Sequence, residues 1–533
     1  MRAAIIAPPY PLAEAPSPSL GVSYVASAFE QAGADVLVID YIVQQYTPDK
    51  LKRTLDEFQP DIIGSTAVTM NFPVAAKIMT EAKKVAPHAV AIMGGPHVSF
   101  DVVNTLKTYG ELDFIVIGEG EATIREMVDQ FRGGGNWTAV KGIAFRRNGE
   151  IVMTGHRDLI TDLDTLPLPA RHLLPLSRYR ALGFPVTMIT SRGCPYSCIF
   201  CLGRRMVGSK PRRRKASLVV DEMEHILSYG FTRINIADDL FTADKEKVRD
   251  VCEEIRRRKL KIEWTAFARV NTVDKDTLVL MRETGCDCIS FGIESGNPAM
   301  LKRVKKGITL EQARNAVDLC KETGIMPHAS FMVGLPGETP DTLNDTAAFS
   351  KSLDVLYGYH FLAPFPGTTV REKIDEYDLE ILTDDWSRYD ANSAIVRTSA
   401  LTPEAMNTFV AEYDREFEEA WEKMVEGYIN KTNTPEDDLR VAGHFRMKLV
   451  YQILSEDLLE KCGNYPIDNG DVDVPEAIRI LSKRIEQSTA SDFKLIYQAI
   501  QNFVDSGYIK YKKANDRLSW YWTHNNKLEH YPS

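Results

Sequence analysis

The sequence lacks the features that mark a membrane or secreted protein. No apolar run in its 533 residues approaches the roughly 20 residues needed to cross a bilayer. Pro8 and Pro9 break the first apolar stretch too early for a signal peptide. Cysteine is scarce, with eight residues and none before Cys194, so no disulfide framework is indicated. We therefore expect a cytoplasmic protein without a membrane partner.

An excess of positive charge is also missing. The chain has 64 Lys and Arg against 74 Asp and Glu, a formal net charge of −10 at pH 7. This balance argues against a nucleic-acid partner, which would be held through many phosphates. One basic run is either a solvated segment or a binding site for anionic groups of cofactors: Arg204, Arg205, Lys210, Arg212, Arg213, Arg214 and Lys215.

What is present is an ordinary globular composition, with 44% apolar and 26% charged residues. The length exceeds what one hydrophobic core supports and predicts three or four domains.

Three of the cysteines form the most informative motif. Cys194, Cys198 and Cys201 follow a C-x3-C-x2-C spacing. An electron-transfer [4Fe–4S] cluster normally takes four thiolates, so three would leave one iron open to bind and activate another molecule. The alternative is a zinc site with a distant fourth ligand, but zinc pairs usually come as two C-x2-C knuckles and the sequence has no second knuckle. The remaining cysteines are scattered and suit core positions: Cys252, Cys286, Cys288, Cys320 and Cys462.

Short apolar runs alternate with helix-length amphipathic stretches in residues 1–140. The runs are Ala3–Ala7, Asp35–Ile39, Asp61–Gly64, Val90–Met93 and Phe114–Ile117. Continuous apolar strands separated by helices predict an α/β domain whose parallel sheet is covered on both faces, a Rossmann-like fold.

Ligands of such sheets bind at the carboxyl ends of the strands. Glycine pairs at these ends let a large flat ligand approach the backbone. The candidate binding residues are Pro8, Pro9, Tyr10, Ser65, Thr66, Val68, Gly94, Gly95, Pro96, His97, Gly118, Glu119 and Gly120.

Residues 141–183 are expected to be a connector. Gly142–Val152 predicts a hairpin with its turn at Asn148-Gly149, and Leu166–Arg171 is an extended, proline-containing tether. From 184 to 400 the alternation resumes and predicts a partial βα barrel, whose chemistry belongs at the C-terminal ends of the strands. Its strands are expected within Pro185–Thr190, Arg233–Ala237, Trp264–Phe267, Cys288–Ile293, Pro327–Met332 and Tyr357–Phe361.

The cysteine motif, with Phe200 directly before its last member, resembles the signature of the radical S-adenosylmethionine (SAM) superfamily. With the glycine-containing turns in order before it, the chain from residue 1 to about 400 resembles the cobalamin-dependent radical SAM class. That class includes the anaerobic magnesium-protoporphyrin cyclase and many C-methyltransferases. The resemblance implies a [4Fe–4S] cluster held by the three cysteines, SAM on the open iron and beside Phe200, and cobalamin in the first domain.

The resemblance also implies roles for residues at the ends of the barrel strands. Asp238 and Asp239 are expected to receive the SAM amino group, although Asp239 also suits a helix N-cap. Arg269 suits the SAM carboxylate, with a surface arginine as the alternative. Glu294 and Ser295 are placed to accept ribose hydroxyls, and the turns Gly334–Glu338 and Phe365–Thr368 to form the adenosine side and the rim. An aromatic set faces either the substrate or, as is more usual, the core: His328, Tyr357, Tyr359 and His360.

Cobalamin domains of the methionine-synthase type replace the lower base with a histidine in Asp-x-His-x-x-Gly, and the sequence has no such run. We expect the lower base to be displaced without a histidine in its place. His97 is then a loop histidine that contacts neighbouring backbone or a corrin side chain, and less readily an axial ligand.

The resembled chemistry is transfer of a methyl group from methylcobalamin to an unactivated carbon, consuming two SAM molecules per methyl group. We expect a C-methyltransferase, with a protein residue such as glutamine of methyl-coenzyme M reductase as a candidate substrate. The alternatives are an oxidative cyclase or ring-rearranging enzyme and a non-enzymatic cobalamin sensor. A methylthiotransferase is disfavoured, because it would need cysteines for a second cluster in residues 1–193 and the sequence has none there. Expected partners are a reductant such as flavodoxin or ferredoxin and a protein substrate, for an enzyme that is itself a monomer.

Residues 401–533 lie outside the resemblance. Pro403–Tyr428 predicts an amphipathic helix, and 492–522 predicts a helix followed by two strands with a turn at 514–516, the end of a winged-helix unit. This mainly helical domain either recognises a protein substrate or packs against the barrel.

Overall fold

The computed structural model describes residues 1–10, 16–467, 471–514 and 516–524. The first domain is built on a seven-stranded sheet with the order β2-β1-β3-β4-β5-β6-β7. Its parallel strands are β1 (Arg2–Ala7), β2 (Asp35–Asp40), β3 (Ile62–Thr66), β4 (Val90–Gly94) and β5 (Phe114–Val116). These strands confirm the expected Rossmann-like sheet.

Helices cover both faces of this sheet, because strand residues on each face are apolar. One face packs against α1 (Leu20–Gln31) and α6 (Glu121–Gly133). The other packs against α2 (Pro48–Phe58), α3 (Phe72–Val85), α4 (Pro96–Phe100) and α5 (Val102–Thr108). The strand order changes direction beside β1, so the carboxyl ends of β1, β3, β4 and β5 border one crevice.

The predicted hairpin forms but extends the first sheet, whereas the sequence assigned it to the connector. It consists of β6 (Ile143–Arg147) and β7 (Glu150–Met153), and β6 pairs antiparallel with β5. Asn148 and Gly149 both have positive φ, 52° and 83°, as the predicted tight turn requires. The chain then leads through α7 (Leu176–Leu182) to the barrel.

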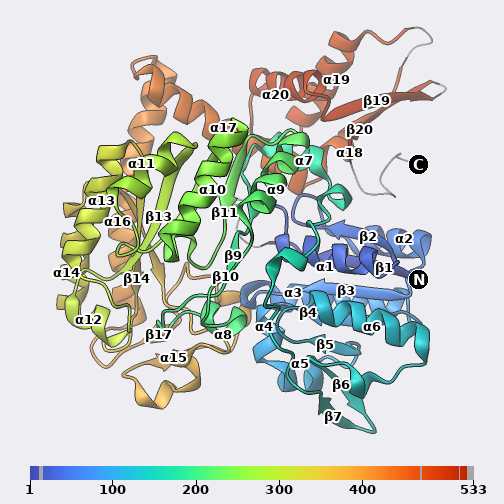
Figure 1. Cartoon of the computed structure of the whole chain (residues 1–533). Helices are drawn as coiled ribbons and strands as arrows, with labels where there is room; N and C mark the ends of the chain where they lie inside the picture. Colours follow the sequence, from blue (N-terminus) through green and yellow to red (C-terminus); the bar gives the residue numbers. More distant parts are fainter. Residues whose placement is uncertain (11–15, 468–470, 515, 525–533) are drawn as a thin grey trace.

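The second sheet has six parallel strands in the order β15-β14-β13-β12-β11-β8 and forms the expected partial barrel (Figure 1). The strands are β8 (Val186–Met188), β11 (Arg233–Ile236), β12 (Glu263–Ala268), β13 (Cys286–Glu294), β14 (Met326–Val333) and β15 (Leu356–Phe361). The connecting helices are α9 (Ala216–Ser228), α10 (Lys245–Arg258), α11 (Lys275–Glu283), α12 (Pro298–Arg303), α13 (Leu310–Thr323) and α14 (Pro340–Ser352). Short elements at the rim are α15 (Thr369–Glu372), β16 (Glu380–Ile381) and β17 (Val396–Arg397).

The C-terminal region begins with two long helices, α16 (Pro403–Asn430) and α17 (Pro435–Ser455). It continues as α18 (Leu458–Cys462), β18 (Asn464–Pro466), α19 (Val474–Glu486), α20 (Phe493–Asp505), β19 (Ile509–Ala514) and β20 (Arg517–Trp522). The sheet order β18-β20-β19 with these helices gives the topology of a winged-helix unit, more complete than the sequence indicated. Asn515, in the predicted turn, lies outside the described residues. Within the described ranges, no helix combines the length and apolarity that a bilayer crossing needs.

Candidate functional site

The three motif cysteines lie on one loop that is closed by a short ribbon. β9 (Ser191–Arg192) pairs antiparallel with β10 (Arg212–Arg213), and residues 193–211 between them, here called the cysteine loop, include α8 (Gly203–Val207). Gly193 has φ 106°, and an added Cβ would lie 2.7 Å from the Lys210 carbonyl oxygen. Only glycine fits this close return of the loop.

Burial raises the pKa of two thiols of this loop, those of Cys194 and Cys201. The pKa of Cys201 rises to about 11, and neighbouring thiols and Asp239 add to the effect of burial at both sulfur atoms. Cluster assembly therefore releases protons. Within the part of the chain that the structure describes, no three His, Cys, Asp or Glu side chains are grouped as a site for one metal ion. A cubane binds each thiolate through a different iron atom.

Two cations lie beside the cysteine loop. The Arg269 guanidinium stacks 3.6 Å from the Tyr196 ring centroid, and its Nη1 donates to Cys198 Sγ at 3.6 Å. Lys306 Nζ lies 6.0 Å from the Phe200 ring centroid. The structure thus places Arg269 where positive charge faces the thiolates, and it is 6% exposed, so the surface alternative is wrong.

The neighbouring carboxylates of Asp238 and Asp239 have different surroundings. Asp238 is buried and accepts hydrogen bonds from Thr190 N, Thr190 Oγ1 and Ser191 Oγ, each at 2.6 Å, so its expected contact with SAM conflicts with its internal partners. Asp239 accepts from Gly193 N at 3.1 Å and so faces the cysteine loop. The expectation that Asp239 caps the next helix is wrong, because Asp244 is the N-cap of α10.

Glu294 ends β13 in a strained conformation. Its φ is 76°, outside the range that a glutamate normally adopts. Its Oε1 lies 2.7 Å from Lys306 Nζ, and both side chains are buried. Ser295 is fully buried, with its Oγ 3.0 Å from Thr346 Oγ1 and accepting from Asn297 N, so it is internally satisfied. Sequence reasoning missed Lys306, whose only signal was a Lys-Lys-Gly turn.

The aromatic set of β14 and β15 divides between the faces of the sheet. The rings of Tyr357 and Tyr359 contact Phe331 and Tyr413 in the core. Side chains alternate along a strand, so His328 and His360 belong to the opposite, inner face of the barrel. Burial, with a smaller effect of the neighbouring His360, lowers the pKa of His328. The side chain of His360 is itself exposed.

The two turns expected beside SAM each have contacts within the protein. In Gly334–Glu338, the Glu338 carboxylate accepts from Gly334 N at 2.6 Å, and burial raises the pKa of Glu338 to about 7. In Phe365–Thr368, an added Cβ on Gly367 would lie 2.3 Å from the Phe100 ring of the first domain. The second turn is therefore a domain contact.

A cavity of about 230 Å³, here called the sheet cavity, lies at the carboxyl edge of the first sheet. Eight of the predicted residues line it: Ser65, Thr66, Gly94, Gly95, Pro96, Gly118, Glu119 and Gly120. Its inner wall comes from α1 and α6 and includes Gly21, Val22, Val25, Phe29 and Ile124. Arg192, Met206 and Val207 line it from the barrel side, so the cysteine loop forms part of its wall.

Five further predicted residues, Pro8, Pro9, Tyr10, Val68 and His97, lie away from the described lining of this cavity. His97 is 1% exposed and stacks on Phe72 with ring centroids 4.0 Å apart. Its Nδ1 lies 3.3 Å from Thr69 Oγ1, and Trp386 contacts its ring edge. Burial, with Arg371 nearby, lowers the pKa of His97 to about 4. The structure thus encloses this histidine in an aromatic core and turns it away from the sheet cavity.

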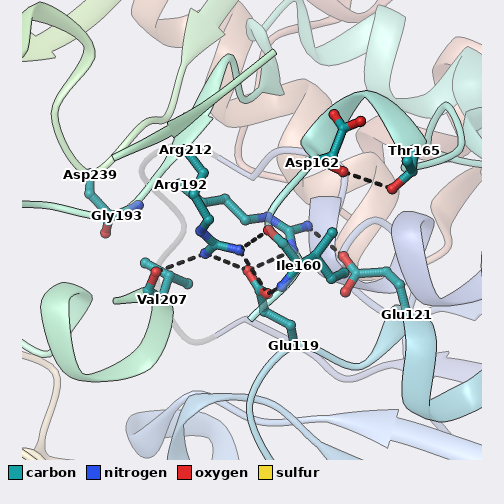
Figure 2. Close-up of polar contacts among 10 residues, drawn as sticks. All are labelled: Glu119, Glu121, Ile160, Asp162, Thr165, Arg192, Gly193, Val207, Arg212 and Asp239. Atoms are coloured by element: carbon teal, nitrogen blue, oxygen red, sulfur yellow. Dashed lines mark hydrogen bonds and ion pairs between the residues drawn. The ribbon is translucent and has the colours of Figure 1, made fainter. Parts of the chain in front are cut away.

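The basic run forms ion pairs, which neither alternative anticipated. Arg205 pairs with Glu372, Arg213 with Asp244 and Arg214 with Glu222. Arg212 donates twice to Glu119, as Figure 2 shows. The run therefore attaches the cysteine loop and its flanks to their surroundings.

The two sites suit the cofactors that the sequence indicated. Three thiols with adjacent cations match a cluster ligated through three irons. The sheet cavity is largely apolar, with Glu119, Glu121 and Arg192 as its charged members, and an added Cβ at Gly94 would have its nearest neighbour at 3.8 Å, so a ligand can approach the backbone there. Its volume is below the roughly 300 Å³ of pockets that enclose drug-sized ligands, so it can enclose only part of a molecule as large as cobalamin.

Comparison with known proteins identifies the family. The radical SAM superfamily model matches residues 188–350, and the B12 binding domain model matches residues 13–128. The chain is 34% identical over 393 residues to an uncharacterized methyltransferase of Pyrococcus horikoshii, covering 73% of this chain and 85% of that protein. The chain belongs to the cobalamin-dependent radical SAM enzymes. Within them it is a radical SAM enzyme of the methyltransferase group, with a [4Fe–4S] cluster, SAM and cobalamin as cofactors.

Two further similarities bear on its place in the family. The chain is 31% identical over 399 residues to the anaerobic magnesium-protoporphyrin IX monomethyl ester cyclase of Cereibacter sphaeroides, covering 72% of this chain and 64% of that protein. The solved structure of the radical SAM methyltransferase TsrM from Kitasatospora setae, with cobalamin and the [4Fe–4S] cluster bound, aligns with a TM-score of 0.63 and 17% identity. That alignment covers 95% of this chain and 99% of the other and shows that the fold is shared through the C-terminal region.

Proposed function

We propose that the enzyme transfers a methyl group to an unactivated carbon atom. The observation that carries this proposal is the shared wall between the two cofactor sites. Arg192, Met206 and Val207, from the ribbon and loop that hold the cysteines, line the same cavity as the glycines of the first sheet. When bound, the cluster and cobalamin supply reductive cleavage of SAM and a transferable methyl group.

The protein contributes positioning and charge. Cys194, Cys198 and Cys201 hold the cluster, and Arg269 faces their thiolates with positive charge. Asp239 and Glu294 lie at strand ends beside the cysteine loop and bind the amino group and ribose hydroxyls of SAM. The open inner face of the barrel, with His328 and His360, receives the substrate. By holding these partners in one geometry, the chain removes much of the entropic cost of bringing them together.

The test is a product balance with SAM that carries a deuterated methyl group. The anaerobically reconstituted enzyme, a one-electron reductant and candidate substrates should give one S-adenosylhomocysteine and one 5′-deoxyadenosine per methyl group transferred. The product should carry one deuterated methyl group in place of the hydrogen atom that 5′-deoxyadenosine has taken up. Turnover that yields 5′-deoxyadenosine and a product without the label would contradict methyl transfer.

Cys198→Ala is the matched control for the cluster. We expect this variant to lose the visible absorption of the cluster and the cleavage of SAM, because two thiolates cannot replace three. Cobalamin should still bind, since the sheet cavity does not include Cys198 among its described lining residues. Full iron content with SAM cleavage in this variant would refute the assignment of the site.

The second candidate function is an oxidative cyclisation or rearrangement that uses cobalamin without methyl transfer. It is favoured by the 31% identity to the magnesium-protoporphyrin cyclase. The labelled product separates the two candidates, because cyclisation leaves the substrate without an added methyl group.

For the substrate we favour a protein residue such as glutamine of methyl-coenzyme M reductase. The support is the winged-helix unit, because the chemistry of the two cofactors requires only the first two domains. We further propose that the enzyme works as a monomer with a flavodoxin or ferredoxin as reductant. Its location would be the cytoplasm, where low-potential electrons and free thiols persist.

A further inference from the structure

A buried set of four charged residues joins the first sheet to the cysteine loop. This carboxylate–arginine cluster consists of Glu119, Glu121, Arg192 and Arg212 (Figure 2). Glu119 Oε1 accepts from Arg192 Nη1 at 3.1 Å and from Arg212 Nη2 at 2.8 Å, and Glu119 Oε2 accepts from Arg212 Nη1 at 3.0 Å. The side chains of Glu119, Arg192 and Arg212 are only 5%, 11% and 10% exposed.

The two arginines face each other across the neck of the cysteine loop. Arg192 and Arg212 are register partners in the antiparallel β9–β10 ribbon, and all three cysteines lie in the loop that this ribbon closes. Glu119 binds both arginines, so a single carboxylate from the first domain attaches both strands of the neck. The orientation of the loop relative to the first sheet therefore depends on this residue.

The charges of the cluster balance, and the low exposure makes that balance necessary. Glu121, in the first turn of α6, also binds Arg192, which gives two carboxylates for two guanidinium groups. Burial of Arg212 and Glu119 removes most of the water that would otherwise compensate their charges. Removing one partner leaves an uncompensated buried charge, which is strongly destabilising locally.

The same residues form part of the sheet cavity. Glu119, Glu121 and Arg192 line it together with Gly118 and Gly120. A cofactor arm that fills the cavity therefore lies against the carboxylate that holds the neck of the cysteine loop. The Arg205–Glu372 pair provides a contrast, because it joins the same loop to α15, away from the described cavity lining, with side chains 42% and 43% exposed.

We propose that Glu119 is a positioning residue that holds the cysteine loop in fixed register with the cobalamin-binding cavity. The inference rests on the proposed function in that it assumes that both cofactors act on one substrate. Glu119 sets their separation through Arg192 and Arg212.

The test compares Glu119→Gln with Glu372→Gln in the full-length reconstituted enzyme. The first readout is the cobalt-to-cluster separation from pulsed electron paramagnetic resonance of bound cob(II)alamin and the reduced cluster. We expect Glu119→Gln to retain iron and cobalamin but to show a broader distribution of cobalt-to-cluster distances. It should also form more 5′-deoxyadenosine per methyl group transferred. Glu372→Gln should match the wild type in both respects.

The second readout is amide hydrogen exchange of residues 191–213 without added cofactors. Glu119→Gln should exchange roughly tenfold faster there, because the neck opens locally. If Glu119→Gln fails to fold, Arg212→Gln, which keeps the Glu119–Arg192 contact, should show the same changes to a smaller extent. Unchanged separation and unchanged exchange would overturn the inference. A wild type that binds both cofactors but never methylates would instead refute the proposed function, and the two readouts would still decide the role of Glu119.

Discussion

At the scale of single residues, the site depends on which buried polar groups already have partners. Asp238 and Asp239 are adjacent in sequence and follow the same strand, yet one is enclosed and the other faces the cysteine loop. Asp238 receives three donors from Thr190 and Ser191, which fixes the segment that leads into the loop. Asp239 accepts a hydrogen bond from the Gly193 amide of that loop and, among the described residues, lacks the three donors that enclose Asp238, so it is the better candidate for cofactor binding.

The two aspartates should therefore differ when each is replaced by alanine. Asp238→Ala leaves buried donors unsatisfied and should lower the free energy of unfolding by about 3 kcal/mol. Asp239→Ala should change the unfolding free energy little but weaken SAM binding. Denaturant unfolding and SAM binding of both variants check this contrast, and equal destabilisation by the two substitutions would contradict it.

His97 gives a pH dependence whose sign follows from its enclosure. Its pKa in the folded protein is about 4, below the usual 6.5, so the unfolded chain binds a proton more readily. The stability that His97 contributes is complete above pH 6.5 and is lost as the pH falls through 4, a total of about 3 kcal/mol. Relative to His97→Phe, the wild type should lose this stability between pH 6.5 and 4, as measured by urea unfolding. If the difference in unfolding free energy between the two proteins did not change with pH, His97 would not be an enclosed, neutral histidine.

At the scale of elements, two adjacent glycines at the end of β4 serve different purposes. Gly95 has φ 103°, and an added Cβ would lie 2.6 Å from Thr66 Oγ1 and 2.7 Å from the Ala67 carbonyl oxygen. Gly95 is therefore required by the turn itself. At Gly94 an added Cβ would make only an ordinary contact, with Val116 at 3.8 Å, and the residue borders the sheet cavity, so the turn itself does not require glycine there.

Gly94→Ala, whose Cβ fits at ordinary contact distance from Val116, should keep the wild-type melting temperature and bind hydroxocobalamin roughly tenfold more weakly, a loss of about 1.4 kcal/mol of binding free energy. Gly95→Ala should instead lower the melting temperature, because the backbone must move. Calorimetry and hydroxocobalamin titration of both variants separate the two effects. If both variants were less stable than the wild type, Gly94 would also be required by the fold, and the separate role given to it in the cavity would be wrong.

The alternation of strands and helices was sufficient to predict both sheets, because buried parallel strands have continuous apolar sequences. It was not sufficient to predict partners of buried polar groups. Asp238 is satisfied by residues 47 and 48 positions earlier, and Lys306 reaches Glu294 only through the packing of the barrel. The hairpin at Asn148-Gly149 was predicted correctly, but its attachment to β5 depends on a long-range pairing that local sequence does not encode.

At the scale of the whole molecule, the C-terminal region is joined to the other domains by buried charge. Arg178 of α7 lies 3.6 Å from Asp457 Oδ1 and donates to Glu460 Oε1 at 2.6 Å, with its side chain 3% exposed. Lys50 of the first domain also pairs with Asp457, at 3.2 Å. Apolar residues of α17 to β20 belong to the same core cluster as those of the barrel and α7. The region is therefore packed against the catalytic domains, and its absence would expose part of their core.

The role of this region in recognition is consequently better tested at its surface than by deletion. Removal of residues 401–533 should give a poorly soluble protein that loses its cofactors, because the apolar face of α7 becomes exposed. The wing is the hairpin of β19 and β20, and its first strand carries Lys510, Lys512 and Lys513. A charge reversal there, Lys510→Glu, changes an exposed side chain and should leave SAM cleavage and cobalamin binding intact. If the wing binds a protein substrate through its positive charge, methylation of that protein should fall while a short peptide with the target residue still reacts, since docking mainly raises local concentration. Equal methylation of protein and peptide by the wild type and the variant would assign the region a purely structural role.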